Sequence, residues 1–182
     1  MDQVILLLGP SGSGKGAQAA LLAKRLEGKV ISTGELLREH AQTSYDIASG
    51  DLADSSDITR LLTDALARVP QNQPIIFDGV ARMPEEAAWL QAELASRDRR
   101  VNLVIELVVP ESELIERLHK RLITEGRNDD TMAGIHKRLG WYHDVVQKTL
   151  QYWRTQTQVV QVDGSGTPDS VAQRIQEVID AA

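Results

Sequence analysis

The sequence of 182 residues contains no cysteine. This absence excludes a disulfide framework, catalysis by a thiolate and a metal site with cysteine ligands, and it suits a reducing compartment. The four histidines show no spacing with acidic residues that is typical of metal ligands. We therefore interpret them as surface or packing residues.

Long hydrophobic runs are also missing. The longest apolar run near the start, Val4–Leu8, is too short to span a membrane, and no basic segment precedes it as in a signal peptide. We therefore expect a cytoplasmic protein with no membrane partner. The net charge of −6 argues against broad binding of nucleic acid, but the later arginines suggest a locally basic site.

The chain lacks internal repeats, low-complexity tracts and an interdomain linker, so we expect one domain over residues 1–182. Short apolar runs alternate with longer helical patterns, which predicts an α/β fold: a parallel sheet with helices on both faces. The expected strands are Gln3–Leu8, Lys29–Ser32, Pro74–Phe77, Leu103–Val109 and Val159–Val162. The expected helices are Lys15–Leu26, Ile58–Val69, Glu85–Ser96, Glu111–Ile123, a long one from about Thr131 to Arg154, and Asp169–Asp180.

Two polar stretches, Thr43–Ser56 and Thr124–Asp130, interrupt this alternation. Both are candidates for mobile flaps beside a functional site, because excursions from a packed core often carry function.

A glycine-rich loop, Gly9–Gly16, follows the first strand and opens the first helix. Glycines let successive backbone amides point at one spot, the helix N-terminus adds partial positive charge, and Lys15 adds a full one. The pattern predicts a phosphate-binding P-loop, against the alternative of a simple Gly/Ser turn before a buried helix. Gly16 stands where a Ser or Thr usually helps to hold magnesium, which favours a particular branch of P-loop proteins.

Several segments resemble motifs of the adenylate kinase family. The loop and its continuation to Gln18 are similar to that family's phosphate loop, and the arginine spacing of its short-lid branch recurs without gaps. The other matching segments are Ile31–Arg38, Phe77–Arg82, Gly126–Asp130 with Arg138, Leu139 and Tyr142, and Gly164–Pro168; the arginines are Arg117, Arg121, Arg127 and Arg138.

This resemblance implies a five-stranded sheet of order 2-3-1-4-5 and a kinase that uses Mg²⁺ and ATP to phosphorylate a nucleoside monophosphate. Its partners would be small nucleotides, and we expect a monomer. On the ATP side, the implied phosphate-binding residues are Gly12, Ser13, Gly14, Lys15, Gly16 and Ala17. Arg121 would hold ATP beneath a short lid at about residues 119–130, Gly166 would lie against the adenine, and Asp78 would orient the water shell of the magnesium ion.

On the acceptor side, the resemblance implies a shortened excursion at about residues 32–56. The residues expected to bind the acceptor are Thr33, Arg38, Asp51, Leu52, Ala53, Gly79, Arg82, Glu86, Arg127 and Arg138. Arg117, Arg127 and Arg138 would converge on the transferring phosphoryl group, and with Lys15 and Arg82 they are the catalytic candidates. Arginine suits this task because its planar fork binds two phosphate oxygens and stays charged, although any single arginine could equally belong to a solvated helix face.

The sequence departs from the family pattern at several positions. Ala17 replaces a threonine, Val80-Ala81 replaces Phe-Pro, and Glu86 replaces the glutamine that usually reads the AMP base. A carboxylate only accepts hydrogen bonds, so Glu86 would suit guanine or cytosine better than adenine, unless it serves only the first turn of its helix. AMP is the acceptor by default. Other bases, a phosphorylated metabolite that is not a nucleotide, and an ATP-binding regulatory module without transfer are the alternatives.

Overall fold

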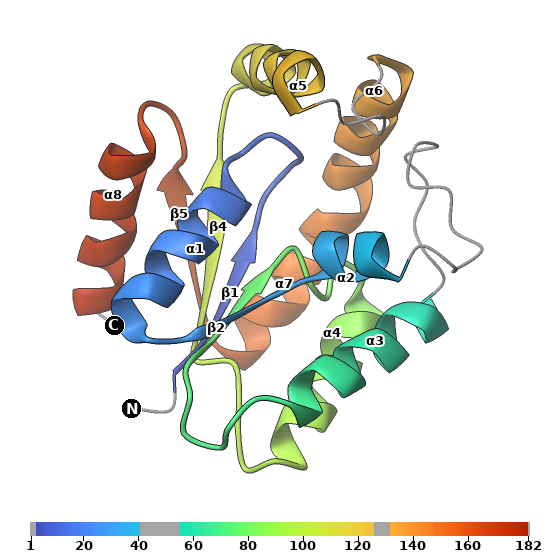
Figure 1. Ribbon diagram of the computed structural model, residues 1–182, viewed down its shortest axis with the longest axis vertical. Helices are drawn as coiled ribbons and strands as arrows, with labels where there is room; N and C mark the ends of the chain where they lie inside the picture. Colours follow the sequence, from blue (N-terminus) through green and yellow to red (C-terminus); the bar gives the residue numbers. More distant parts are fainter. Residues whose placement is uncertain (1–2, 41–54, 126–131, 182) are drawn as a thin grey trace.

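The computed structural model describes residues 3–40, 55–125 and 132–181, and its centre is one parallel sheet (Figure 1). Its strands are β1 (Val4–Leu8), β2 (Lys29–Ser32), β3 (Ile75–Asp78), β4 (Leu103–Val108) and β5 (Gln158–Asp163). They run in the order β2-β3-β1-β4-β5, which confirms the expected fold class and strand order. The three inner strands are apolar and largely buried, as the unbroken apolar runs predicted.

Helices cover both faces of this sheet. They are α1 (Lys15–Leu26), α2 (Thr33–Glu39), α3 (Ser55–Ala67), α4 (Pro84–Ala95), α5 (Glu111–Glu125), α6 (Met132–Trp141), α7 (Gln147–Gln156) and α8 (Pro168–Asp180), with a π-helical turn, η3 (Tyr142–Val146), between α6 and α7. One core cluster joins α1 and α8 to the sheet, and another joins α3, α4 and α7 to it. Pro84 and Pro168 begin α4 and α8, where a missing amide costs nothing.

A third, smaller cluster of apolar side chains joins α5 to α6. Leu114 and Leu118 of α5 pack there with Ile135 and Leu139 of α6. In Figure 1 these two helices lie together at one end of the molecule, beyond the ends of the strands. The segments expected to carry the lid arginines therefore form a unit with its own apolar contacts.

Besides shifts of one or two residues at other helix ends, three details differ from the sequence-based expectation. Helix α2 was not predicted as a separate helix, and α3 starts at Ser55 instead of Ile58. The single long helix expected from Thr131 to Arg154 is divided by η3, because buried residues three to five positions apart fit an α-helix and a π-turn alike. In the expected excursion at 32–56, residues 41–54 lie outside the described residues, as do residues 126–130 of the expected lid. No helix in the described part of the chain is long and apolar enough to cross a membrane.

Candidate active site

The functional candidates gather at the carboxyl edge of the sheet. Because all five strands are parallel, the segments that follow β1 and β3 emerge at the same edge. Strand β1 lies between β3 and β4, so the chain crosses to opposite sides of β1 at this point. A crevice at such a reversal of strand order is where open α/β sheets bind ligands.

The glycine-rich loop leads from β1 directly into α1. Gly12 and Gly14 have positive φ angles of 86° and 91°, a backbone conformation that favours glycine. A Cβ atom on Gly12 would lie 2.9 Å from Leu118 Cγ, so this position has no space for a side chain. Gly14 precedes the first turn of α1, and no side chain caps that turn. The first amides of α1 therefore have no side-chain cap and can donate to an anion, as anion binding at a helix N-terminus requires.

Lys15 places its ammonium group inside this loop. Its Nζ donates to the carbonyl oxygens of Gly9 and Pro10, both at 2.8 Å. The pKa of Lys15 is lowered from 10.5 to about 8, mainly because burial disfavours the charged form. Asp78 opposes this shift and raises the pKa, whereas Arg82 and Arg121 lower it, so all three charges act on the Lys15 ammonium.

A pocket opens above this lysine and collects cationic side chains from three separate segments. Lys15 comes from α1, Arg82 from the turn after β3, and Arg138 from α6. The other lining residues are Leu8, Gly9, Ser11, Gly79, Trp141, Tyr142 and Val146. Segments that lie far apart in the sequence thus bring three predicted phosphate-binding residues together, where they can share the charge of a polyphosphate.

The turn after β3 holds Arg82 rigidly. Its Nε donates to the Gly79 carbonyl oxygen at 2.6 Å, and its own carbonyl oxygen accepts from Thr149 Oγ1 at 2.6 Å. Gly79 has a φ of 63° and Ala81 one of 54°, so two residues of this short turn are left-handed. Proline, which the adenylate kinase motif has in place of Ala81, cannot adopt such an angle. The turn therefore presents its arginine through a different local backbone.

Glu86 serves the start of α4. It is buried, and its Oε2 accepts from the backbone amides of Arg82 at 2.9 Å and Met83 at 3.4 Å. These are amides at the beginning of a helix, which otherwise lack partners. The geometry thus agrees with the reading of Glu86 as a residue of the first helical turn, while its reading of an acceptor base stays a prediction.

Asp78 ends β3 beside the phosphate loop. It accepts from Ser32 Oγ at 3.2 Å, and a Cβ atom on Gly16 would lie 3.5 Å from its Oδ2. A carboxylate this close to the loop is the kind of oxygen ligand that Mg²⁺ and its water shell prefer. The residues present therefore fit the expected magnesium site. Ala17 is exposed on α1 and offers no hydroxyl there.

The acceptor side is described in part. Thr33 is buried, and its Oγ1 has no hydrogen-bond partner within residues 3–40, 55–125 and 132–181. Arg38 is exposed one turn further along α2, with its guanidinium over Gly34. Four expected site residues lie outside the described residues: Asp51, Leu52, Ala53 and Arg127.

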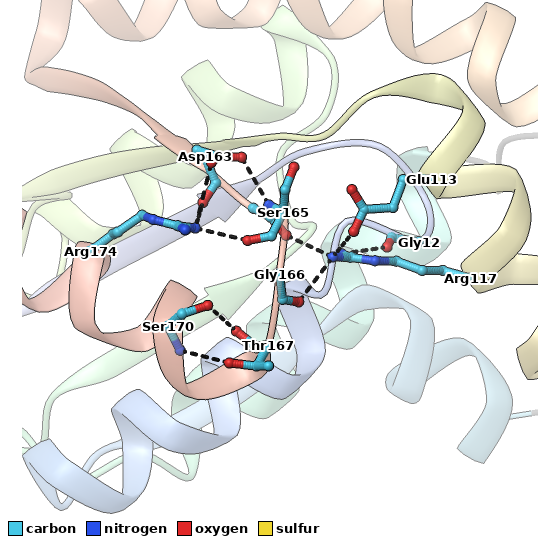
Figure 2. Close-up of polar contacts among 10 residues, drawn as sticks. Gly12, Glu113, Arg117, Asp163, Ser165, Gly166, Thr167, Ser170 and Arg174 are labelled. Carbon is cyan, nitrogen blue, oxygen red and sulfur yellow. Dashed lines mark hydrogen bonds and ion pairs between the residues drawn. The ribbon is translucent and has the colours of Figure 1, made fainter.

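Arg117 lies apart from the pocket that Lys15, Arg82 and Arg138 line. Figure 2 shows its guanidinium between Glu113, Gly12 and Gly166. It pairs with Glu113 Oε1 at 2.6 Å and donates to the carbonyl oxygens of Gly164 at 3.0 Å and Gly166 at 3.3 Å. The structure thus brings Arg117 to Gly12 of the phosphate loop and to the loop after β5, which was expected to touch the adenine, whereas its convergence with Arg127 and Arg138 stays a prediction.

Several residues that support the site residues are not predicted by the sequence analysis. Gln18 is buried and donates from Nε2 to the Pro168 carbonyl oxygen at 2.9 Å, which joins the phosphate-loop helix to the start of α8. Thr149 and Ser32, described above, support Arg82 and Asp78. Glu106 is a further buried polar residue, and the sequence does mark it, because it is an acid between Ile105 and Leu107 in an otherwise apolar strand. Gln18, Thr149 and Ser32 carry no such signal, since they look like ordinary polar residues of helices and strand ends.

Comparison with known proteins shows the family to which the chain belongs. The family model described as adenylate kinase matches residues 7–158. An adenylate kinase of Micrococcus luteus is 34% identical over 96% of this chain and 89% of its own length. One from Xylella fastidiosa is 36% identical over 94% of this chain and 96% of its own, and one from Thermus thermophilus is 34% identical over 98% of each. The phosphate loop, the converging cations and these matches together place the chain in the adenylate kinase family of phosphotransferases.

Proposed function

We propose that this nucleoside monophosphate kinase transfers the γ-phosphoryl group of ATP to AMP. The observation that carries the proposal is the pocket in which Lys15, Arg82 and Arg138 meet above the phosphate loop. Phosphoryl transfer needs two anionic substrates held in line and cations around the spreading charge, with little covalent work from the protein. The names of the relatives favour AMP as the acceptor.

On the donor side, the amides at the start of α1 and the Lys15 ammonium would hold the β- and γ-phosphates. The ammonium would exchange its bonds to Gly9 and Pro10 for phosphate oxygens. Arg121 acts on the same ammonium and comes from α5, so it would approach the phosphates from the lid side. Gly166, held by Arg117, would lie against the base, and Arg117 would shape the base end of the donor site.

On the acceptor side, Arg82 and Arg138 would bind the monophosphate and the transferring group between them. The buried Thr33 hydroxyl has no partner among the described residues, and it would gain a hydrogen bond from the acceptor because a buried donor without a partner is costly. Arg38 and Gly79 would complete this side, together with Arg127 and residues 51–53. Asp78 would hold Mg²⁺ through water, and the ion, when bound, would neutralise charge on the β- and γ-phosphates.

The test is product detection from Mg-ATP with a panel of monophosphates. Formation of ADP from AMP, with weaker turnover of GMP, CMP and UMP, is the expected result. Exclusive phosphorylation of GMP or CMP would show that this nucleotide, and not AMP, is the acceptor. If every nucleoside monophosphate were inert while ATP still turned over, a phosphorylated metabolite would be the acceptor. ATP binding without any turnover would indicate a regulatory module.

Two coarser properties belong to the same proposal. The cysteine-free sequence fits the reducing cytoplasm, which fractionation of cells with an antibody to the protein would test. We also propose a monomer, because both substrate sides are built from one chain. Light scattering at micromolar concentration would test this state.

A further inference from the structure

A buried carboxylate lies beside the active-site pocket without contributing to its lining. Glu106 in β4 is 3% exposed, although the strand around it is apolar. Its Oε1 accepts from Tyr142 Oη at 3.0 Å and from Gln147 Nε2 at 3.3 Å, and its Oε2 accepts from Gln161 Nε2 at 2.9 Å. Burying a carboxylate among neutral donors costs more than burying an apolar residue of similar size, so the site calls for an explanation other than stability.

The position of Glu106 connects it to the phosphate loop. In the sheet register Glu106 is the partner of Leu8 in β1, the residue directly before the glycine-rich loop, and Leu8 lines the pocket. On its other side Glu106 is the partner of Gln161 in β5, one of its own hydrogen-bond donors. The carboxylate is thus fixed to the rigid part of the fold that carries the loop.

The Tyr142 hydroxyl connects Glu106 to the arginine helix. Tyr142 is buried, lines the pocket and begins the π-turn η3, four residues after Arg138. Residues four apart lie on one face of a helix, so both side chains reach toward the pocket from the end of α6. Burial raises the pKa of the Tyr142 phenol, and the adjacent Glu106 charge raises it further, so the hydroxyl remains a donor. A π-turn at this junction is an irregularity often found at functional sites.

We propose that Glu106 is a positioning residue for the transfer reaction: through Tyr142 it fixes the end of α6, and with it Arg138, over the phosphate loop. This inference rests on the proposed role of Arg138 and adds the device that sets its place. Helix α6 also contacts α5 through a small apolar cluster and packs Trp141 against the main core, and such apolar contacts supply no direction. A directional bond from the sheet supplies it, because catalysis by arginine depends on placing its donors within a fraction of an ångström of the phosphoryl oxygens.

The test compares Tyr142→Phe with Tyr152→Phe in the full chain. Tyr152 is partly buried on α7 and lies outside the pocket, so its variant controls for the loss of one phenol hydroxyl. Steady-state kinetics with Mg-ATP and AMP should show kcat reduced about tenfold in Tyr142→Phe, the size expected for one hydrogen bond to a charged group. KM for ATP should stay within about twofold of wild type, because the loop itself is intact. Tyr152→Phe should keep the wild-type kcat.

A double variant separates positioning from mere stability. In an Arg138→Ala background, Tyr142→Phe should lower kcat little further, because the side chain that it positions is gone. Glu106→Gln, which keeps an oxygen for the tyrosine, should retain most of the turnover, whereas Glu106→Leu should lose it. An unchanged kcat in Tyr142→Phe, or a full tenfold loss repeated in the Arg138→Ala background, would overturn the inference. Failure of the wild-type chain to phosphorylate AMP would instead count against the proposed function.

Discussion

Replacing Lys15 by methionine tests the electrostatics of the phosphate loop most directly. The pKa of Lys15 is lowered from 10.5 to about 8, chiefly by burial. At about 1.4 kcal/mol per unit, the folded protein holds this charged lysine at a cost of about 3 kcal/mol at pH 7. Methionine removes the charge but also leaves the carbonyl oxygens of Gly9 and Pro10 without their donor, which costs about 1 kcal/mol for each oxygen. The unliganded variant should therefore be more stable than wild type by about 1 kcal/mol, and it should lose transfer activity.

The pH dependence gives the sign of this effect. Between pH 8 and 10.5 the unfolded chain binds the Lys15 proton and the folded chain releases it. Stability therefore gains from this group as the pH rises through that window, while below pH 8 the full cost remains. The advantage of Lys15→Met should thus be largest at pH 7 and shrink toward pH 10.

Urea unfolding of the unliganded protein at pH 7 and pH 9.5, together with the AMP assay, would measure both consequences. Lys24→Met is the matched control, because Lys24 is exposed in the last turn of the same helix and should shift stability by about 0.5 kcal/mol or less. A Lys15→Met protein less stable than wild type at pH 7 would show that burial of the ammonium is not the dominant effect. A folded variant with undiminished turnover would refute the loop assignment itself.

Four other substitutions test the remaining parts of the site. Arg138→Ala should lower kcat by about 100-fold or more with little change in KM for ATP. Arg117→Ala should mainly raise KM for ATP, because Arg117 holds the Gly164–Gly166 loop. Equal losses of kcat for the two variants in steady-state kinetics would contradict these separate roles. Ala81→Pro, which restores the family residue, should cost about 3 kcal/mol or more in urea unfolding, because proline cannot adopt a φ of 54°; unchanged stability would mean that the turn can rearrange. Glu86→Ala should cost about 1–2 kcal/mol by the same measurement and leave the acceptor preference unchanged, and a switch from AMP to another base would show instead that its carboxylate reads the base.

The strands could be predicted from the sequence because each is a nearly unbroken apolar run between polar segments. Lys29–Ser32 was correct in full, and the other expected strands differ by one residue at one end or at both ends. Helix α2 was not predicted because Thr33, Gly34 and Glu35 are typical of a polar turn. Its short apolar pair, Leu36-Leu37, shows no helical period. The strand order came from family resemblance, since periodicity carries no information about which strands pair.

From the residues alone, only the part of the site that follows from the direction of the strands could be predicted. A loop after β1 and a turn after β3 must meet at one edge of a parallel sheet, so the approach of Lys15 and Arg82 followed from strand positions alone. Arg117 shows the limit. The family resemblance predicted that it converges on the phosphoryl group, but only the fold shows that its guanidinium binds Glu113 and the loop after β5. Such pairings depend on segments almost fifty residues away.

The turn between β3 and α4 shows how a divergent sequence can keep a functional arginine in place. With Val80-Ala81 where the family has Phe-Pro, the backbone passes through a left-handed Ala81, a conformation that costs about 1–2 kcal/mol for a residue with a Cβ atom. The cost is tolerated because neighbours determine the turn from both sides: Glu86 binds the amide of Arg82, and Thr149 donates to its carbonyl oxygen. The Arg82 Nε also donates to the Gly79 carbonyl oxygen. The family motif is therefore one solution to a geometric requirement, and the requirement is the position of the guanidinium above Lys15.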